Sequence, residues 1–153
     1  MICIFGTVKL TTFTDYSLRV LMYLAANPTR RATIAEIATA FGVSENHLVK
    51  VVHFLGRQGW IETVRGKGGG IALAMPAEQV GVGRVVRDAE GAVVPAECFS
   101  EGGGSCVIAD SCRLRSTLGE AVSAFYGVLD RYTLADIARN RQTLTKVLKI
   151  LPG

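Results

Sequence analysis

The chain has 153 residues, 49% of them hydrophobic and 20% charged, which is the composition of a soluble globular protein with enough apolar mass for a core. No segment resembles a membrane span and the first ten residues lack the basic region of a signal peptide, so we expect a cytoplasmic protein without a membrane partner. The net charge of +4 is unevenly spread, since residues 1–75 carry eight Lys and Arg against four acids, residues 76–112 two against six, and residues 113–153 seven against three. The basic N-terminal half favours a nucleic-acid partner, with ordinary scatter of surface charge as the alternative.

The first predicted element is a helix over residues 12–26. Apolar side chains recur there at helical spacing, Thr12 followed by Asp15 has the S/T-x-x-D form of a helix start, and Asn27-Pro28 provides a stop. We expect its buried face to consist of Phe13, Tyr16, Val20, Leu21 and Leu24.

The next two predicted helices form a helix-turn-helix pattern. The first of them begins at Thr33, where Glu36 completes a capping box, and the second covers residues 45–58. Between them, Gly42-Val43-Ser44 is expected to form a tight turn that ends in a helix cap. Two short helices joined by a glycine-containing turn are typical of helix-turn-helix units. The side chains expected to be buried are Ile34, Ile37, Ala38 and Phe41 in one helix and Leu48, Val51, Val52 and Leu55 in the other.

The polar face of the helix over residues 45–58 is a candidate DNA-reading surface. Ser44, Asn46 and His47 lie in its first turn, the part of a recognition helix that meets base edges. Lys50 and Arg57 suit phosphate contacts, which add affinity without sequence information. Any exposed helical face is polar, so an ordinary solvated helix is the alternative for this segment taken alone.

A β-hairpin is predicted directly after this helix. Residues 60–64 and 71–74 read as paired strands, and the segment RGKGGG between them would form a tip whose glycines let the backbone approach a duplex. Arg65 and Lys67 can contact phosphates or enter a narrow minor groove. A phosphate-binding loop is the competing interpretation, and it fails because no GK[ST] follows and no helix opens after the glycines. Helix, helix-turn-helix and hairpin in this order predict a winged helix-turn-helix DNA-binding domain over residues 10–78, in a fold that is mainly α with a small β-hairpin wing.

Three of the four cysteines, Cys98, Cys106 and Cys112, lie in one short segment with the spacing C-x7-C-x5-C. The glycines at 102–104 exclude a regular helix or strand there and indicate a flexible loop. Thiolates suit iron–sulfur clusters and zinc, but three are one short of the usual four ligands, so a fourth must come from elsewhere or the site stays open. Unliganded thiols, one disulfide and a structural zinc site remain alternatives. A thiol enzyme would need a nearby base, which this loop does not offer in sequence, so we expect no enzyme.

A helix over residues 80–90 is predicted before the cysteine loop and a long helix over residues 113–131 after it. The long helix carries an apolar stripe of Leu114, Leu118, Val122, Phe125 and Leu129, which needs a partner. We interpret it as a dimerisation helix, with packing inside the same chain as the alternative. Thr133 and Asp136 are expected to cap a further short helix. The expected organisation is an N-terminal extension (1–9), the winged-helix domain (10–78), a linker helix with the cysteine cluster loop (79–112), the dimerisation helix and its cap (113–139), and a C-terminal tail (140–153).

Over roughly residues 8–139 the chain resembles the iron–sulfur winged-helix family of bacterial regulators, which includes the nitric-oxide-sensing repressor NsrR and the cluster-assembly regulator IscR. The residues that carry the resemblance are LTTFTDYSLRVLMYLA at 10–25, IAEIA at 34–38, VRGKGGGIAL at 64–73, and the three-cysteine loop followed by a long helix. The start of the chain favours the NsrR-like members. The resemblance implies a homodimeric repressor of a double-stranded DNA operator, with nitric oxide as the signal.

The same resemblance implies an iron–sulfur cluster held by Cys98, Cys106 and Cys112, expected as [4Fe–4S]. In NsrR-like members the fourth ligand can be an aspartate at the start of the first helix, donated by the other subunit, and Asp15 stands at that position. An acid in a first helical turn is also favoured by the helix dipole, which is the alternative reason for its presence. A cluster-status or redox sensor with a [2Fe–2S] cluster is the alternative function.

Two features depart from the family pattern. IscR-like members use a histidine shortly after the third cysteine, where this chain has Arg113-Leu114-Arg115. The first cysteine spacing of seven residues is longer than the five that are common in the family, which leaves the cluster type open. Cys3, in the expected N-terminal extension, is assigned no role.

Overall fold

The structure is a computed structural model that describes residues 9–102 and 104–150. Cys3 and most of the expected N-terminal extension lie outside these residues, as does the end of the tail. The elements in chain order are α1 (Thr12–Ala26), α2 (Ile34–Phe41), α3 (Glu45–Arg57), β1 (Ile61–Val64), β2 (Gly70–Leu73), η1 (Ala77–Gln79), α4 (Val82–Glu90), η2 (Glu97–Phe99), η3 (Ala109–Ser111), α5 (Arg113–Leu129), α6 (Leu134–Ile137) and α7 (Arg141–Val147). The prediction of a mainly helical fold with a small β-hairpin is confirmed.

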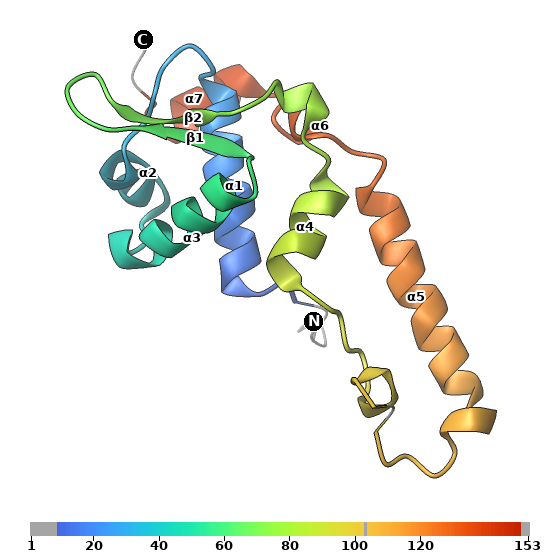
Figure 1. Ribbon diagram of the computed structural model, residues 1–153. Coiled ribbons are helices and arrows are strands. Elements are labelled where there is room, and N and C mark those ends of the chain that lie inside the picture. Colours follow the sequence, from blue (N-terminus) through green and yellow to red (C-terminus); the bar gives the residue numbers. More distant parts are fainter. Residues whose placement is uncertain (1–8, 103, 151–153) are drawn as a thin grey trace, which may run out of the picture.

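Helix α1 is the central helix of the molecule (Figure 1). It contacts α3, α4, α6, α7 and β2, and the predicted core residues Val20, Leu21 and Leu24 are at most 2% exposed. Phe13 and Tyr16 are only partly buried, because they lie near the start of α1 beside α3. The four residues predicted for the core side of α3 are all buried, whereas in α2 full burial is limited to Ile37 and Ala38.

The start of α1 differs from the prediction. Thr11, and not Thr12, is the N-cap residue, since its hydroxyl oxygen accepts a hydrogen bond from the Thr14 backbone N–H at 3.2 Å. Thr11 is itself fixed by Glu90 at the end of α4, whose carboxylate accepts hydrogen bonds from the Thr11 N–H and hydroxyl at 2.7 and 3.1 Å. Because this contact joins residues far apart in sequence, the local pattern could not distinguish the two neighbouring threonines.

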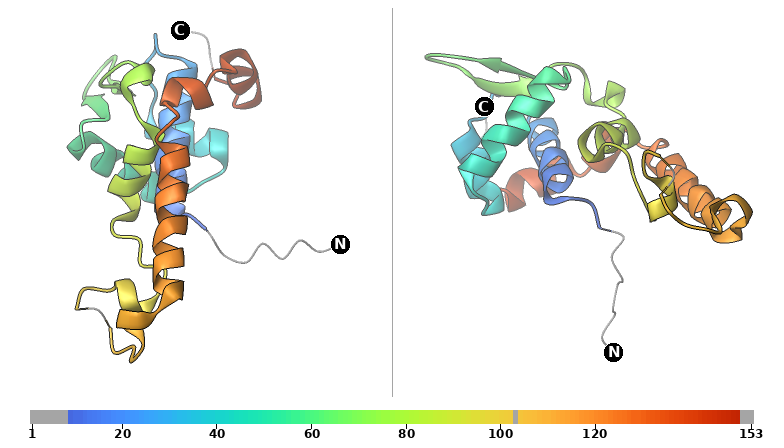
Figure 2. Two further views of the ribbon diagram at one scale, coloured as in Figure 1. Left: turned by 90° about the vertical axis from the view of Figure 1, so that its right-hand side faces the viewer. Right: turned by 60° about the horizontal axis from the view of Figure 1, so that its bottom comes forward.

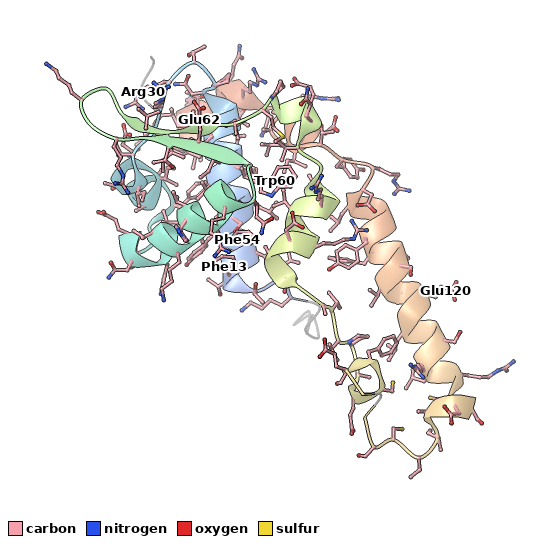
Figure 3. The ribbon with its side chains drawn as sticks, viewed as in Figure 1. Phe13, Arg30, Phe54, Trp60, Glu62 and Glu120 are labelled. Carbon is pink, nitrogen blue, oxygen red and sulfur yellow. The ribbon has the colours of Figure 1, made fainter. Side chains whose placement is uncertain are left out.

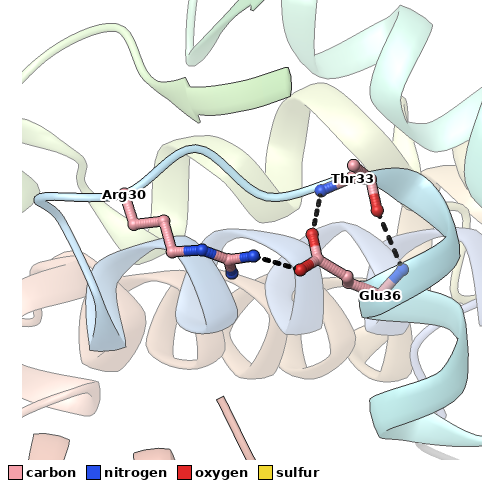
Figure 4. Close-up of polar contacts among 3 residues, drawn as sticks. All are labelled: Arg30, Thr33 and Glu36. Atoms are coloured by element: carbon pink, nitrogen blue, oxygen red, sulfur yellow. Dashed lines mark hydrogen bonds and ion pairs between the residues drawn. The ribbon is translucent and has the colours of Figure 1, made fainter. Parts of the chain in front are cut away.

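The helices of the helix-turn-helix begin and end within one residue of the predicted boundaries. Thr33 and Glu36 form the predicted capping box before α2, and Arg30 adds an ion pair to the Glu36 carboxylate (Figure 4). Gly42 ends α2 with a φ of 64°, a left-handed conformation that glycine adopts without steric cost. Ser44 occupies the predicted N-cap position of α3, although its side chain makes no capping hydrogen bond.

The wing is the antiparallel pair β1–β2, with Ile61 opposite Leu73. Ala32, in the loop between α1 and α2, pairs with Ile71 of β2 through two backbone hydrogen bonds of 2.9 and 2.7 Å. An isolated two-stranded hairpin is at best marginally stable, so this third backbone segment and the buried Ile61 and Ile71 anchor the wing to the helical core.

Helix α4 packs beside α1, and α5 runs next to α4 in the opposite direction, so that the start of α5 and the loop residues 91–102 and 104–112 project from the rest of the molecule (Figures 1 and 2). Val82 and Val86 of α4 and Tyr126 of α5 form a small second core, against which Val122, Phe125 and Leu129 pack partly buried. Leu114, near the start of α5, is 62% exposed. The apolar stripe of α5 therefore packs on its own chain over its C-terminal half and is uncovered near its start, and its role in dimerisation stays a prediction.

The C-terminal residues return to α1. Thr133 and Asp136 form the predicted capping box of α6, with Asp136 Oδ2 accepting from the Thr133 N–H at 2.8 Å. Helix α7 lies beside α1, and Leu144, Leu148 and Ile150 pack against the main core. The tail, for which the sequence suggested no role, thus completes the core. Among the described helices none has the length and apolarity needed to cross a membrane.

Candidate DNA-binding surface and cysteine loop

The outward side of α3 carries the predicted recognition residues. All five are exposed, namely Ser44, Asn46, His47, Lys50 and Arg57. Buried Leu48 and Val51 hold the other side of α3 against the core. Hydrogen-bonding side chains thus stand at the start of the helix and cations further along it, an order suited to reading base edges and binding phosphates.

Two further residues share this exposed face and were not predicted as site residues. Val49 is 50% exposed and His53 is also exposed. Counted from Asn46 they lie three and seven positions further on, which places them on the same side of a helix. An exposed valine on a recognition helix can contact a thymine methyl group. The helical spacing from Asn46 is the sequence signal that would have identified both.

The tip of the wing presents Arg65 and Lys67 to solvent. The prediction attributed the tip glycines to close approach of a duplex, but the turn itself requires them. A Cβ on Gly69 would lie 2.3 Å from the Val64 carbonyl oxygen, and Gly66 and Gly68 have φ values of 91° and 74°. The glycines therefore close the hairpin, and this closure leaves both cations exposed.

The first turn of α1 packs directly against α3. The rings of Phe13 and Phe54 meet edge to face with centroids 5.1 Å apart (Figure 3), and the Tyr16 ring lies 6.3 Å from that of His47. Packed side chains transmit displacements because protein interiors leave little free space. The start of α1 and the recognition helix are therefore in direct side-chain contact.

The cysteine loop connects α4 to α5 and contains three free thiols. Cys98 is buried, Cys112 is partly buried, and Cys106 is exposed. The Glu97 carboxylate accepts hydrogen bonds from the Ser105 N–H and hydroxyl, both at 3.0 Å, which lower the pKa of Glu97. Since Glu97 precedes Cys98 and Ser105 precedes Cys106, these bonds bring the backbones of the first two cysteines together.

This closure depends on a glycine. A Cβ on Gly104 would lie 2.9 Å from the Glu97 carbonyl oxygen, and the φ of Gly104 is 64°. The long first spacing therefore forms a closed turn. Sequence reasoning found the glycines but missed Glu97 and Ser105, whose pairing depends on that backbone conformation.

The chemical type of the donor side chains suits an iron–sulfur cluster. Cys98, Cys106 and Cys112 are free thiols on one loop, and Cys112 is the N-cap of α5, where the helix dipole favours negative charge. Across residues 9–102 and 104–150, however, no three His, Cys, Asp or Glu side chains are gathered closely enough to hold a metal ion. The donors fit the group chemically, and the loop must draw them closer together to bind it.

The predicted fourth ligand, Asp15, is occupied within its own helix. Arg19 donates to Asp15 through Nε, at 3.1 Å from Oδ1, and through Nη2, at 2.7 Å from Oδ2. The start of α1 lies beside α3 and α4, whereas the cysteine loop lies beyond the end of α4 (Figures 1 and 2). The structure therefore does not bring Asp15 to the cysteines within one chain, and its role as a ligand from a second copy stays a prediction.

A helix-turn-helix with an exposed recognition helix, a basic wing and an attached cysteine loop define a winged-helix, DNA-binding transcriptional regulator. The chain belongs to the Rrf2 family of iron-dependent transcriptional regulators, whose sequence profile matches residues 10–140. It is 46% identical over 143 residues to the HTH-type transcriptional regulator NsrR of Bacillus subtilis (strain 168), covering 93% of this chain and 98% of the relative. It is also 46% identical over 142 residues to NsrR of Geobacillus kaustophilus (strain HTA426), covering 92% of this chain and 97% of that relative.

Solved structures agree with this assignment. The cysteine regulator CymR of B. subtilis superposes with a TM-score of 0.68 at 27% identity, covering 88% of this chain and 98% of CymR. IscR of T. potens superposes with a TM-score of 0.68 at 26% identity, covering 87% of this chain and 88% of IscR. The chain is thus an NsrR-type transcriptional regulator and not an enzyme, and its family implies an iron–sulfur cluster.

Proposed function

We propose that the protein is a cytoplasmic, homodimeric repressor whose binding to a double-stranded operator is controlled by a nitric-oxide-sensitive iron–sulfur cluster. The observation that carries this proposal is the set of three free thiols on a glycine-closed loop next to a winged-helix unit. The identity to regulators named NsrR over more than nine-tenths of the chain supports the same function.

In this proposal Cys98, Cys106 and Cys112 hold the cluster as [4Fe–4S], and Asp15 of a second copy is the fourth ligand. When bound, the cluster supplies iron with which nitric oxide reacts. Arg19 competes for the Asp15 carboxylate, because it already binds both of its oxygens. Whichever group holds Asp15 fixes the first turn of α1. Phe13 and Phe54 connect that turn to the recognition helix.

On the operator, each subunit presents one α3 and one wing. Ser44, Asn46 and His47 face base edges in the major groove, while Lys50, Arg57, Arg65 and Lys67 neutralise phosphates. Two symmetry-related recognition helices then require a pseudo-palindromic site.

The test is anaerobic absorbance and resonance Raman spectroscopy of the purified protein before and after nitric oxide. Operator binding is measured in parallel on duplexes that the protein itself selects from random sequence. We expect the broad visible absorbance of a [4Fe–4S] centre, which nitric oxide abolishes together with operator binding. A stable [2Fe–2S] spectrum would instead support the redox or cluster-status sensor.

Cys106→Ala should lack the visible absorbance and the nitric oxide response, because Cys106 is one of only three cysteines in the loop. Cys3→Ala removes the cysteine outside the loop and serves as the matched control, which should keep both properties. A Cys106→Ala protein that retains both properties would contradict the proposal.

A further inference from the structure

Backbone hydrogen bonds join the start of α4 to the residues that follow α5. The Val82 N–H donates to the Tyr132 carbonyl at 2.9 Å, and the Leu134 N–H donates to the Val80 carbonyl at 2.8 Å. These bonds place the start of α4 beside the chain that leaves α5.

Side chains add a second connection at the same place. Arg87 Nη1 and Nη2 donate to Asp130 Oδ1 and Oδ2 at 2.6 and 2.7 Å, a bidentate pair of defined geometry. The Arg87 guanidinium also lies 4.3 Å from the centre of the Tyr126 ring. Tyr126 is 8% exposed, and its hydroxyl has no hydrogen-bond partner among the described residues, so its ring is held by packing and by Arg87.

Gly83 makes the approach of α4 and α5 possible. A Cβ at this position would lie 2.0 Å from Asp130 Oδ1 and 3.0 Å from the Asp130 backbone nitrogen. A carboxylate can rotate away, but the backbone cannot yield without a shift of α5. We call Gly83, Arg87, Tyr126 and Asp130 together the α4–α5 clamp.

The opposite end of α5 is held much less firmly by its own chain. Residues 113–117 are all exposed, and Leu114 belongs to the uncovered part of the apolar stripe. The contacts that hold α5 to the rest of the chain are therefore concentrated in its C-terminal half, where the clamp lies beside the packed Val122, Phe125 and Leu129.

An exposed ion pair adds little stability, so a contribution to folding does not account for this arrangement. The effect of this ion pair on the direction of α5 is more important than its effect on stability. Helix α5 has 17 residues and so a length of about 25 Å. A tilt of about 10° at the clamp displaces its far end by about 4 Å, which is comparable with the rise of about 3.4 Å per base pair.

We propose that the α4–α5 clamp is a set of positioning residues that fixes the direction of α5 and thereby the separation of operator half-sites that the dimer accepts. This inference rests on the proposed homodimeric function, with α5 as the predicted dimerisation helix. It assigns a determinant of DNA specificity to residues that do not contact DNA.

The experiment is in vitro selection from random duplexes with the anaerobically purified protein, followed by affinity measurements on the selected site with one base pair inserted or removed between half-sites. Arg87→Lys keeps the charge but loses the bidentate geometry, and Gly83→Ala forces the helices apart. Arg84→Lys is the matched control, since it makes the same charge-conserving change on α4 outside the clamp. Dimer mass and the visible spectrum are recorded for every variant.

For the unaltered protein we expect a spacing change to weaken binding about tenfold or more, because one base pair both translates and rotates a half-site. Arg87→Lys and Gly83→Ala should shift the preferred spacing or reduce this discrimination to about threefold or less, whereas Arg84→Lys should behave like the unaltered protein. If Gly83→Ala does not fold, Arg87→Lys decides the matter. Unchanged discrimination in Arg87→Lys, with dimer and spectrum intact, would overturn this inference alone. Selection of single, unpaired half-sites by the unaltered protein would overturn the dimer proposal as well.

Discussion

Glu36 shows how one side chain can organise the helix-turn-helix. Its carboxylate accepts a hydrogen bond from the Thr33 N–H at 2.6 Å and pairs with Arg30, so it connects the loop after α1 to the first turn of α2. Partial burial raises the pKa of Glu36, but the hydrogen bonds from Arg30 and Thr33 outweigh this effect and the pKa lies below its usual value. The negative charge of Glu36 is therefore more favourable in the folded protein than in the unfolded chain.

Glu36→Gln should reduce the free energy of unfolding by about 0.5–1 kcal/mol at pH 7, since glutamine can complete the capping box but cannot pair with Arg30 as an anion. A lowered folded-state pKa gives stability that is present above the unfolded value of about 4.3 and is lost as pH falls through the folded value. The difference between the two proteins should therefore disappear in acid. Urea unfolding between pH 7 and pH 3 measures it, with exposed Glu78→Gln as the control. A difference that persists unchanged at the lowest pH would show that the charge is not responsible.

Among the elements, those defined by local patterns were predictable. The capping boxes at Thr33 and Thr133, the core side of α3 and the strands of the wing all follow from residues close together in sequence. The N-cap of α1 was not predictable, because Thr11 is fixed by a hydrogen bond to Glu90 at the end of α4. Nor was the pairing of Ala32 with Ile71, which joins an irregular loop to a strand.

The candidate site likewise contains features that the sequence predicted and features that it could not predict. The cysteines and the polar face of α3 were found from their spacing, which needs no tertiary information. The Glu97–Ser105 closure was missed because it requires a positive φ at Gly104, and sequence alone does not say which glycine of a run adopts it. The occupation of Asp15 by Arg19 is an i,i+4 pair that the sequence could have indicated.

Arg65→Ala tests the wing as an element that binds DNA. Loss of one phosphate contact should weaken operator binding and make the slope of log affinity against log salt shallower by about 0.9. Binding is measured at several salt concentrations on the same selected duplex. Arg139, which is 84% exposed in the linker between α6 and α7, provides the control Arg139→Ala, which should leave the slope unchanged. An unchanged slope for Arg65→Ala would exclude a phosphate contact by this residue.

For the whole molecule, the main feature is that the first and the last helix of the described residues, α1 and α7, pack together. Helix α1 is enclosed both by the winged-helix elements and by α6 and α7, which follow the long projection. Ile150 is 5% exposed and lies beside Tyr23, Leu24 and Ala32. The C-terminal residues are thus part of the core of the DNA-binding half.

Ile150→Ala should lower the free energy of unfolding by about 2–5 kcal/mol, the usual cost of truncating a buried aliphatic side chain. Val147, on the same C-terminal segment, is 70% exposed, so Val147→Ala should change stability by about 0.5 kcal/mol or less. Urea unfolding followed by circular dichroism measures both. Equal, small effects of the two substitutions would mean that the tail does not contribute to the core.

The backbone pairing of residues 80–82 with 132–134 has a consequence for how such a protein can change over generations. The segment between those residues therefore leaves the molecule and returns to it at one place. Its two ends stay side by side when the loop at its far end changes. Lengthening a flexible loop is cheap, at about 0.6 kcal/mol for each doubling. Insertions and deletions near the cysteines, such as the long first spacing of this chain, can therefore accumulate without disturbing the half that reads DNA. The length of the cysteine loop can therefore change while the fold that carries α3 and the wing is kept.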